Sequence, residues 1–370
     1  MWCKSLVVWL PVALSLMLGG CAIPAVIPPV ESDIEFDRIL ACVEENFPAE
    51  SYFTNDLLPE IESAWEPVEC ESVDQVRVGM SWILNDGGAP WYNAQELGFF
   101  SDRCLEVELV RGGSGLGNLQ TLIDGNVEFA VSAGGSQVPT LALGPEGADI
   151  VAVGSLIRQS PYIWLGLDHD TPADQRSTME LVPEDFVGKT VGLHEGEDYF
   201  FEFISAKYGI TADEVELVVT GYTPEPVLAG EVDYAGAWLI NEPRLLEEQG
   251  HLNWVAFQFS EWGWDDYSEV MVVRRETVEE NPDLVRRYLA AVIQGMEYVL
   301  ENPVESAEIA VRYAVDAPTS VEQALRRYEL QEALVVDGDG LPLGRMSADR
   351  WNMQVASMLQ YNQLELPMCQ

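Results

Sequence analysis

An internal repeat runs through the middle of the chain. Residues 106–110 and residues 214–218 share the sequence Glu-Val-Glu-Leu-Val. Two further blocks keep the same order, residues 78–80 and 122–130 recurring as residues 191–193 and 227–235. Each copy alternates strand-like and helix-like segments. The repeat therefore predicts two α/β lobes of similar build, each with a mostly parallel sheet.

Two runs can carry the chain between these lobes. Residues 150–167 contain two apolar strand-like stretches, and residues 257–273 end in the strand-like sequence Glu-Val-Met-Val-Val. A chain that leaves one lobe and later returns to it forms a two-segment hinge. Such a hinge allows two lobes to close around a ligand.

Helix signals follow the second of these runs. Asn281-Pro282 and Asn302-Pro303 each place an N-cap residue before a proline at the first helical position. Ser347 is placed to cap a last helix. Between them, a spacing of four predicts one buried helix face, made of Leu284, Tyr288, Val292, Met296 and Leu300.

The N-terminus has the features of a signal segment. Lys4 precedes an apolar stretch, Leu6–Leu18, that is short for a membrane span. Leu18-Gly19-Gly20-Cys21 resembles a bacterial lipobox, which implies cleavage before Cys21 and lipid attachment to it. A plain signal peptide with an incidental cysteine is the alternative. We expect an extracytoplasmic protein, periplasmic or on the outer face of a membrane, held to that membrane only through the lipid.

These features divide the chain into six predicted parts. They are a signal peptide, 1–20; a lipid-anchored tether and acidic segment, 21–72; the first part of lobe one, 73–160; lobe two, 161–265; the return to lobe one with its helices, 266–340; and a C-terminal helix and tail, 341–370.

The chain is strongly acidic. It has 62 Asp and Glu against 19 Lys and Arg, a formal net charge of -43. A polyanion of this kind repels nucleic acid and anionic lipid headgroups, so neither is an expected partner. A solvated surface suited to a salty or acidic exterior explains the charge better than an acidic binding patch.

Four cysteines remain once Cys3 and Cys21 are set aside: Cys42, Cys70, Cys104 and Cys369. In an oxidising compartment they predict two disulfides with three possible connectivities. One of these, Cys42–Cys70, would clamp the acidic segment. There is no Cys-x-x-Cys pair and there are three histidines, so we expect no metal site.

The candidate site in lobe one lies in the stretch Trp82–Phe100. A strand-like run, Val76–Ile83, leads into a Gly-Gly-Ala-Pro loop and then a helix start. Ligands of open α/β sheets bind at the carboxyl ends of the strands. The residues predicted to line the cleft from this lobe are Trp82, Asn85, Trp91 and Tyr92, with Ser114 and Ser136 from two glycine-rich loops that can offer backbone N–H groups.

The candidate site in lobe two lies at the matching strand ends. Its predicted ligand-binding residues are Glu195 and Tyr199 at one helix start, Trp238, Asn241 and Glu242 at another, and Trp264 near the hinge. Acidic residues crowd the first of these helix starts, where they would repel an anion. Each residue also has a structural alternative: core packing for the aromatic rings, and ordinary helix capping for Asn241 and the acids.

Several of these blocks together resemble extracytoplasmic solute-binding proteins of ABC importers. The blocks are Trp82–Phe100, 107–109, Gly112–Gly115, 125–130 and 241–243. The most similar branch binds thiamine pyrimidine precursors or riboflavin, within a wider family of nitrate, taurine and sulfonate binders. The resemblance implies a bilobal, type II-like periplasmic-binding-protein fold that closes on a solute and docks onto ABC permease subunits.

From this resemblance we expect a monomer that captures a small aromatic heterocycle, without catalysis and without a cofactor. A binder of nitrate, sulfonate or taurine is the main alternative. A pyrimidine-synthesis enzyme of the same superfamily is a weaker one, because those enzymes carry a cysteine-rich iron motif that is absent from this sequence.

Overall fold

Two five-stranded sheets form the framework of the computed structural model. The first sheet has the strand order β2-β1-β3-β10-β4, with β1 parallel to both of its neighbours and β10 antiparallel to β3 and β4. Its strands are β1 (Asp74–Gly79), β2 (Leu105–Val110), β3 (Phe129–Val131), β4 (Ile150–Ser155) and β10 (Val270–Arg274).

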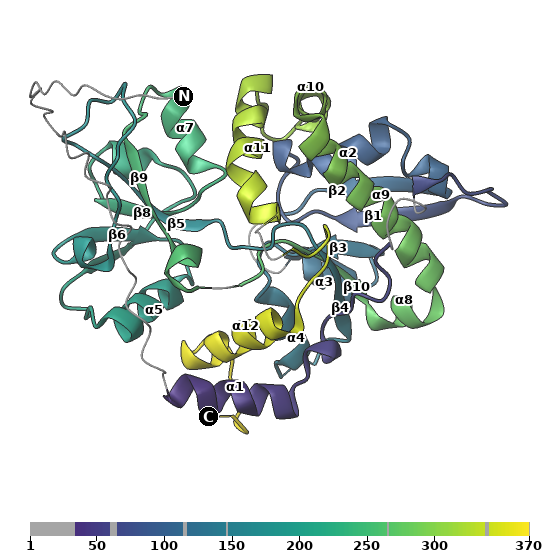
Figure 1. Ribbon diagram of the computed structural model, residues 1–370, viewed down its shortest axis with the longest axis horizontal. Helices are drawn as coiled ribbons and strands as arrows, with labels where there is room; N and C mark the ends of the chain where they lie inside the picture. Colours follow the sequence, from purple (N-terminus) through teal and green to yellow (C-terminus); the bar gives the residue numbers. More distant parts are fainter. Residues whose placement is uncertain are drawn as a thin grey trace, which may run out of the picture. The chain divides into compact units, whose positions relative to one another are not determined.

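The second sheet repeats this arrangement in the order β7-β6-β8-β5-β9, with β6 parallel to β7 and β8, and β5 antiparallel to β8 and β9. Its strands are β5 (Tyr162–Leu167), β6 (Thr190–Leu193), β7 (Glu216–Val219), β8 (Tyr234–Trp238) and β9 (Trp254–Gln258). Figure 1 shows the two sheets with α11 between them.

The sequence repeat sets the strand register of both sheets. Val78 pairs with Leu109 and Phe129 in the first sheet. In the second sheet Val191 pairs with Leu217 and Tyr234, which are the equivalent positions of the repeat. The predicted α/β fold with two similar lobes is therefore confirmed. The chain crosses between the sheets twice, at residues 156–161 and 259–269.

The structure describes residues 34–59, 65–113, 117–145, 147–264, 266–336 and 340–369. The predicted signal peptide, the lipidation site Cys21 and Ser114 lie outside these ranges. So do residues 22–33 and 60–64 of the predicted tether and acidic segment. No helix within these ranges combines the length and the apolar character that crossing a membrane requires.

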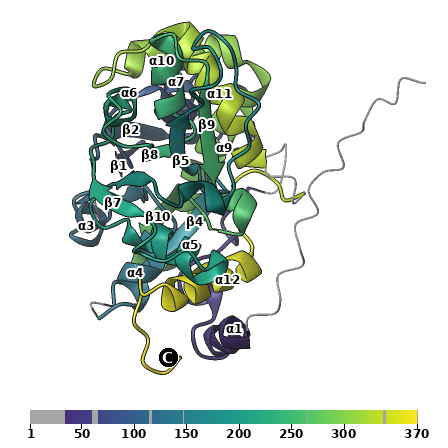
Figure 2. The same ribbon diagram turned by 90° about the vertical axis from the view of Figure 1, so that its left-hand side faces the viewer.

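The helices surround the two sheets, and Figure 2 gives a second view of them. The predicted starts at Pro282, Pro303 and Ala348 are confirmed, and Ser347 accepts a hydrogen bond from the Arg350 backbone as N-cap. The helices are α1 (Ile34–Asn46), α2 (Ala89–Glu96), α3 (Gly117–Ile123), α4 (Gln137–Leu143), α5 (Asp198–Tyr208), α6 (Glu225–Leu228), α7 (Glu242–Glu248), α8 (Arg275–Glu280), α9 (Pro282–Glu301), α10 (Pro303–Tyr313), α11 (Val321–Val336) and α12 (Ala348–Gln360).

Each lobe has its own hydrophobic core. In lobe one, α2 and α9 cover one face of the sheet, where Tyr288 of α9 stacks on Phe129 of β3 with ring centroids 3.8 Å apart. Lobe two has a core rich in aromatic rings, with Phe186 packed edge-on against Trp164 and Phe257. The two cores meet where Ile240 of lobe two packs into the core of lobe one.

The disulfides correct one prediction. Cys42 is bonded to Cys369, and Cys70 to Cys104, so the Cys42–Cys70 connectivity is wrong. Cys70 and Cys104 precede β1 and β2, which are neighbours in the sheet and bring the two cysteines together. Cys42 lies on α1, which packs beside the C-terminal tail in a shared core.

Candidate ligand-binding cleft

A cavity of about 280 Å³ is lined by residues that follow strands of both sheets. This placement agrees with the rule that ligands of α/β folds bind outside the carboxyl ends of the strands. Nine of the twelve residues predicted to bind ligand line this cavity: Trp82, Asn85, Trp91, Tyr92, Ser136, Tyr199, Trp238, Asn241 and Glu242. Their role in binding a ligand stays a prediction.

Trp82 provides the aromatic face of the cleft on the side of lobe one. It lies in the turn after β1, and its ring is half-buried. Across the cleft its neighbour is Tyr222 of lobe two, with ring centroids 5.7 Å apart and planes inclined by 53°. Asn85 follows in the same turn, and its side chain accepts a hydrogen bond from the backbone of Gly87 at 2.9 Å.

Trp91 and Tyr92 contribute to the cleft wall but are anchored in the core. Both are 1% exposed. Trp91 Nε1 donates to the hydroxyl of Tyr288 at 2.8 Å, and the hydroxyl of Tyr92 donates to the backbone oxygen of Asn85 at 3.0 Å. The ring of Tyr92 also stacks on Tyr313, so core contacts hold both aromatic side chains in place.

Gly88 permits this packing of Tyr92. A Cβ atom at residue 88 would lie 2.4 Å from the Tyr92 ring, closer than real side chains approach. The Gly-Gly-Ala-Pro loop therefore lets the backbone pass directly over a buried ring, and it holds the turn between β1 and α2 in place.

Glu197 brings a carboxylate to the cleft from lobe two. It lies just before α5 and accepts a hydrogen bond from the hydroxyl of Tyr162 at 2.8 Å. The Nδ1 atom of His194 lies 2.8 Å from the same carboxylate oxygen. His194 in turn stacks on Tyr222, with ring centroids 4.0 Å apart. These contacts fix both the carboxylate and the ring of Tyr222 at the cleft wall.

Glu242 is a second carboxylate of this wall. It is the first residue of α7, and it accepts a hydrogen bond from the backbone N–H of Trp238 at 2.7 Å. Burial raises the pKa of Glu242, although backbone N–H groups and the charges of His194 and Arg327 oppose the shift.

Glu269 is a third carboxylate, and it lies on the second crossing just before β10. The hydroxyl of Ser81 donates to it at 2.7 Å. Desolvation raises the pKa of Glu269, opposed by the hydrogen bond from Ser81 and by the charge of Arg327. Two carboxylates of lobe two and one of a crossing segment thus converge on one cavity.

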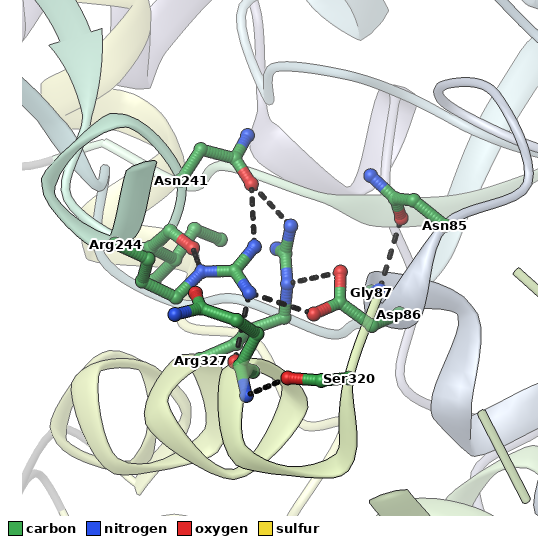
Figure 3. Close-up of polar contacts among 9 residues, drawn as sticks. Asn85, Asp86, Gly87, Asn241, Arg244, Ser320 and Arg327 are labelled. Carbon is green, nitrogen blue, oxygen red and sulfur yellow. Dashed lines mark hydrogen bonds and ion pairs between the residues drawn. The ribbon is translucent and has the colours of Figure 1, made fainter. Parts of the chain in front are cut away.

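Arg327 of α11 is the only basic side chain among the described residues that line the cleft. Its Nε atom donates to Asp86 at 2.9 Å, and its guanidinium also donates to the side-chain oxygen of Asn241 (Figure 3). Asp86 is 2% exposed and also receives a hydrogen bond from Arg244 of lobe two at 2.8 Å. The one cation of the wall is therefore already paired.

Two predicted residues lie outside the cleft. Glu195 is exposed and does not line it, because the turn before α5 brings Glu197 to the wall instead. Trp264 is 4% exposed and packs in the core of lobe two, against Phe200 and Phe203. Core packing therefore accounts for the position of Trp264 near the crossing.

Seven polar or aromatic residues of the described cleft lining were not among the twelve predicted: Ser81, Gln137, Glu197, Tyr222, Glu269, Arg327 and Gln331. The repeat contained a signal for Tyr222, since the shift between residues 110 and 218 aligns it with the predicted residue Ser114. Arg327 and Gln331 lie on a helix whose pattern indicates only packing. No local signal marks them.

The cleft combines flat aromatic rings with hydrogen-bond acceptors on fixed carboxylates. Aromatic faces stack on flat ligands, and carboxylates accept hydrogen bonds from N–H donors. Among the described residues, no group of three His, Cys, Asp or Glu side chains is placed to hold a metal ion. The arrangement suits binding of a flat solute that carries N–H donors.

Known proteins resemble this chain in sequence. The formylaminopyrimidine-binding protein of Halalkalibacterium halodurans is 24% identical over 80% of this chain and 88% of its own length. The riboflavin-binding protein RibY of Chloroflexus aurantiacus is 26% identical over 71% and 73% of the two chains. A 4-amino-5-hydroxymethyl-2-methylpyrimidine phosphate synthase of Legionella pneumophila is 23% identical over 64% and 72%.

Solved structures share the fold. The periplasmic aliphatic sulphonate-binding protein SsuA of Escherichia coli superposes with a TM-score of 0.58 at 14% identity, over 79% of this chain and 94% of its own. At this identity the likeness shows the fold alone. A family model described as NMT1/THI5 like matches residues 85–306 of the 370. Because this match spans more than half of the sequence, the chain belongs to the NMT1/THI5-like family.

Proposed function

We propose that this protein is an extracytoplasmic solute-binding protein that captures a neutral or cationic, nitrogen-rich aromatic heterocycle and delivers it to an ABC permease. One observation carries the proposal. Three carboxylates, of Glu197, Glu242 and Glu269, line a cleft that also presents the ring of Trp82. An aminopyrimidine has a flat ring to stack and N–H donors for carboxylate oxygens, so it matches both features.

The relatives support this ligand class. Two of them are named for binding a formylaminopyrimidine and riboflavin. The cavity of about 280 Å³ is slightly smaller than most small-molecule sites, which measure roughly 300–1,000 Å³. A one-ring pyrimidine therefore fits this arrangement of the lobes better than the three-ring system of riboflavin with its side chain.

Two other functions compete with this one. Binding of a sulfonate is favoured by the fold shared with SsuA, but three wall carboxylates would repel an anion. A pyrimidine-synthesis enzyme is favoured by the relative from Legionella. Absorbance of a bound pyridoxal phosphate in the purified protein would support that enzyme and contradict a pure binding role.

The tether belongs to the same proposal. Lipid on Cys21 would hold the protein at the outer face of a membrane, where a monomer can meet the permease. The four cysteines joined in two disulfides, Cys42–Cys369 and Cys70–Cys104, agree with an oxidising, extracytoplasmic location.

A ligand panel tests the proposal. We expect 4-amino-5-hydroxymethyl-2-methylpyrimidine to quench tryptophan fluorescence and to raise the melting temperature, since ligand that binds only the folded state stabilises it. Trp82→Ala should weaken this binding about tenfold or more, because the stacking face is lost. Trp262→Phe, which changes a ring outside the cleft lining, is the matched control.

The panel also separates the alternatives. Riboflavin, taurine and ethanesulfonate are measured beside the pyrimidine. If taurine or ethanesulfonate stabilises the protein and neither heterocycle does, the proposed ligand class is wrong.

A further inference from the structure

Among the described residues, the only basic side chain of the cleft wall is held by an acid that does not itself line the cleft. Arg327 lines the cavity, whereas Asp86 and Arg244 are absent from its described lining. Asp86 lies in the 3₁₀ turn η3 (Asp86–Gly88) between β1 and α2. Its two carboxylate oxygens each receive one guanidinium, Arg327 at 2.9 Å and Arg244 at 2.8 Å (Figure 3).

The two arginines share a second acceptor, because both donate to the side-chain oxygen of Asn241, Arg244 at 3.4 Å. They differ in their other contacts. Arg244 also donates to the backbone oxygens of Ile240 and Gln323, at 2.7 and 2.8 Å. Of the two, Arg327 is the one among the described residues that lines the cavity.

The charge of Arg327 acts inside the cleft. It lowers the pKa of Glu242 and of Glu269, against the larger effect of their burial. Without a partner, a guanidinium at this place would be a ready donor for a phosphate or sulfonate, because its planar fork matches such oxyanions. The carboxylate of Asp86 already accepts a hydrogen bond from the Nε atom of this guanidinium.

We propose that Asp86 is a specificity-determining residue, which excludes anionic ligands from the cleft by pairing with Arg327. The identification of the ligand as a pyrimidine rests on the proposed function. The exclusion of anions by Asp86 does not depend on that identification. Specificity of this kind comes from a partner that competes with the wrong ligand rather than from a new contact with the right one.

Two double variants separate the two arginines. Removing Asp86 alone leaves two buried guanidinium groups with too little negative charge, which endangers folding. Asp86→Asn with Arg244→Gln keeps the shape of the cluster and its formal charge, and it leaves Arg327 without a carboxylate. Asp86→Asn with Arg327→Gln has the same formal charge but keeps the arginine behind the wall. It is the matched control.

Ethanesulfonate and inorganic phosphate are the probes, titrated at one fixed ionic strength by calorimetry. We expect the Asp86→Asn, Arg244→Gln variant to bind ethanesulfonate at least about tenfold more tightly than the wild type, the gain typical of a charged hydrogen bond. The Asp86→Asn, Arg327→Gln variant should show no gain. An equal gain in both variants, or a gain in neither, overturns the proposal.

The unmodified protein gives an independent test that needs no variant to fold. The 4-amino-5-hydroxymethyl-2-methylpyrimidine alcohol and its phosphate ester differ only in the anionic group. The wild type should prefer the alcohol by about a hundredfold or more, as expected when a charged group is left without its partner. Equal affinity for the two overturns the role of Asp86. Failure to bind either compound contradicts the proposed pyrimidine ligand, while the sulfonate titrations still decide the role of Asp86.

Discussion

Glu242 shows how burial and hydrogen bonding compete at a single residue of the cleft. A carboxylate at the first position of a helix normally has a lowered pKa, because backbone N–H groups favour its charged form. Here the N–H of Trp238 donates to Glu242 at 2.7 Å, yet the pKa is raised because desolvation is the larger effect. The cleft therefore keeps a hydrogen-bond acceptor whose negative charge is destabilised by burial while no ligand donates to it.

This raised pKa predicts a pH dependence of stability. With a folded-state pKa above the unfolded value, the folded state binds the proton more tightly between the two values. The contribution of Glu242 to the free energy of unfolding should therefore fall as the pH rises from about 4.5 through the folded-state pKa. Glu242→Gln should remove this component.

Chemical denaturation of both proteins across this pH range measures the effect as a difference. The many other carboxylates cancel when one curve is subtracted from the other. A difference that is flat with pH, or that has the opposite slope, would contradict the account of Glu242. Glu195→Gln, at an exposed residue outside the cleft, serves as control and should leave the curve within about 0.5 kcal/mol of wild type.

At the same scale, the sequence predicted the residues that local patterns mark. Trp82, Asn241 and Glu242 follow strands within the repeat, so their place at strand ends could be read directly. Arg327 could not be found in this way, because its role depends on Asp86, 241 residues away, and on a helix that packs across the cleft. Trp264 lies in the core of lobe two and not in the cleft lining, and its sequence signal could not show this, because an aromatic residue near a crossing has the same signal in a core as in a lid.

At the scale of elements, α11 joins the two lobes. Arg326 and Arg327 are adjacent on this helix, and both contact lobe two. Arg326 donates to both carboxylate oxygens of Glu247 on α7 at 3.0 Å, and Arg327 donates to Asn241 just before α7. These ion pairs and hydrogen bonds hold α11 to lobe two, so we expect α11 to stabilise the contact between the lobes.

Arg326→Gln should therefore weaken closure. The side chains of Arg326 and Glu247 are 22% and 11% exposed, so we expect a loss of about 1–2 kcal/mol, between the values for exposed and buried charged pairs. Small-angle X-ray scattering should show a larger radius of gyration without ligand, and ligand affinity should fall about tenfold.

Two comparisons support or contradict this assignment. Arg312→Gln removes an ion pair with Glu96 on the surface of lobe one and should change neither quantity. Because Glu247 also pairs with Arg176, a double-mutant cycle with Glu247→Gln isolates the contact to Arg326. A coupling energy near zero would show that α11 does not help to close the lobes.

The strands were the most predictable elements. The repeat predicted equivalent strand-like segments in the two lobes, and the structure pairs the equivalent residues in the same register. The disulfides were less predictable, because four cysteines leave three pairings open and only the packing of α1 against the C-terminal tail selects Cys42–Cys369. Sequence periodicity fixes neighbours within a sheet but not contacts between chain ends.

At the scale of the whole molecule, the acidic net charge does not describe the charges buried in the interior. The chain has 19 basic residues against 62 acidic ones, and four of the arginines, Arg103, Arg158, Arg244 and Arg327, are buried. These four basic side chains are thus held in the interior, although the chain as a whole is strongly acidic. The same holds in the cleft, where the only lining cation, among the residues that the structure describes, is paired with a buried acid.

We propose that the cleft takes a neutral or cationic aromatic heterocycle, and the most direct measurement is mass spectrometry of the small molecules released from the protein after gentle purification. We expect a nitrogen-rich aromatic compound without phosphate or sulfonate, released in stoichiometric amount and lost from the Trp82→Ala variant. A sulfonate or a phosphate ester released in stoichiometric amount would contradict this proposal.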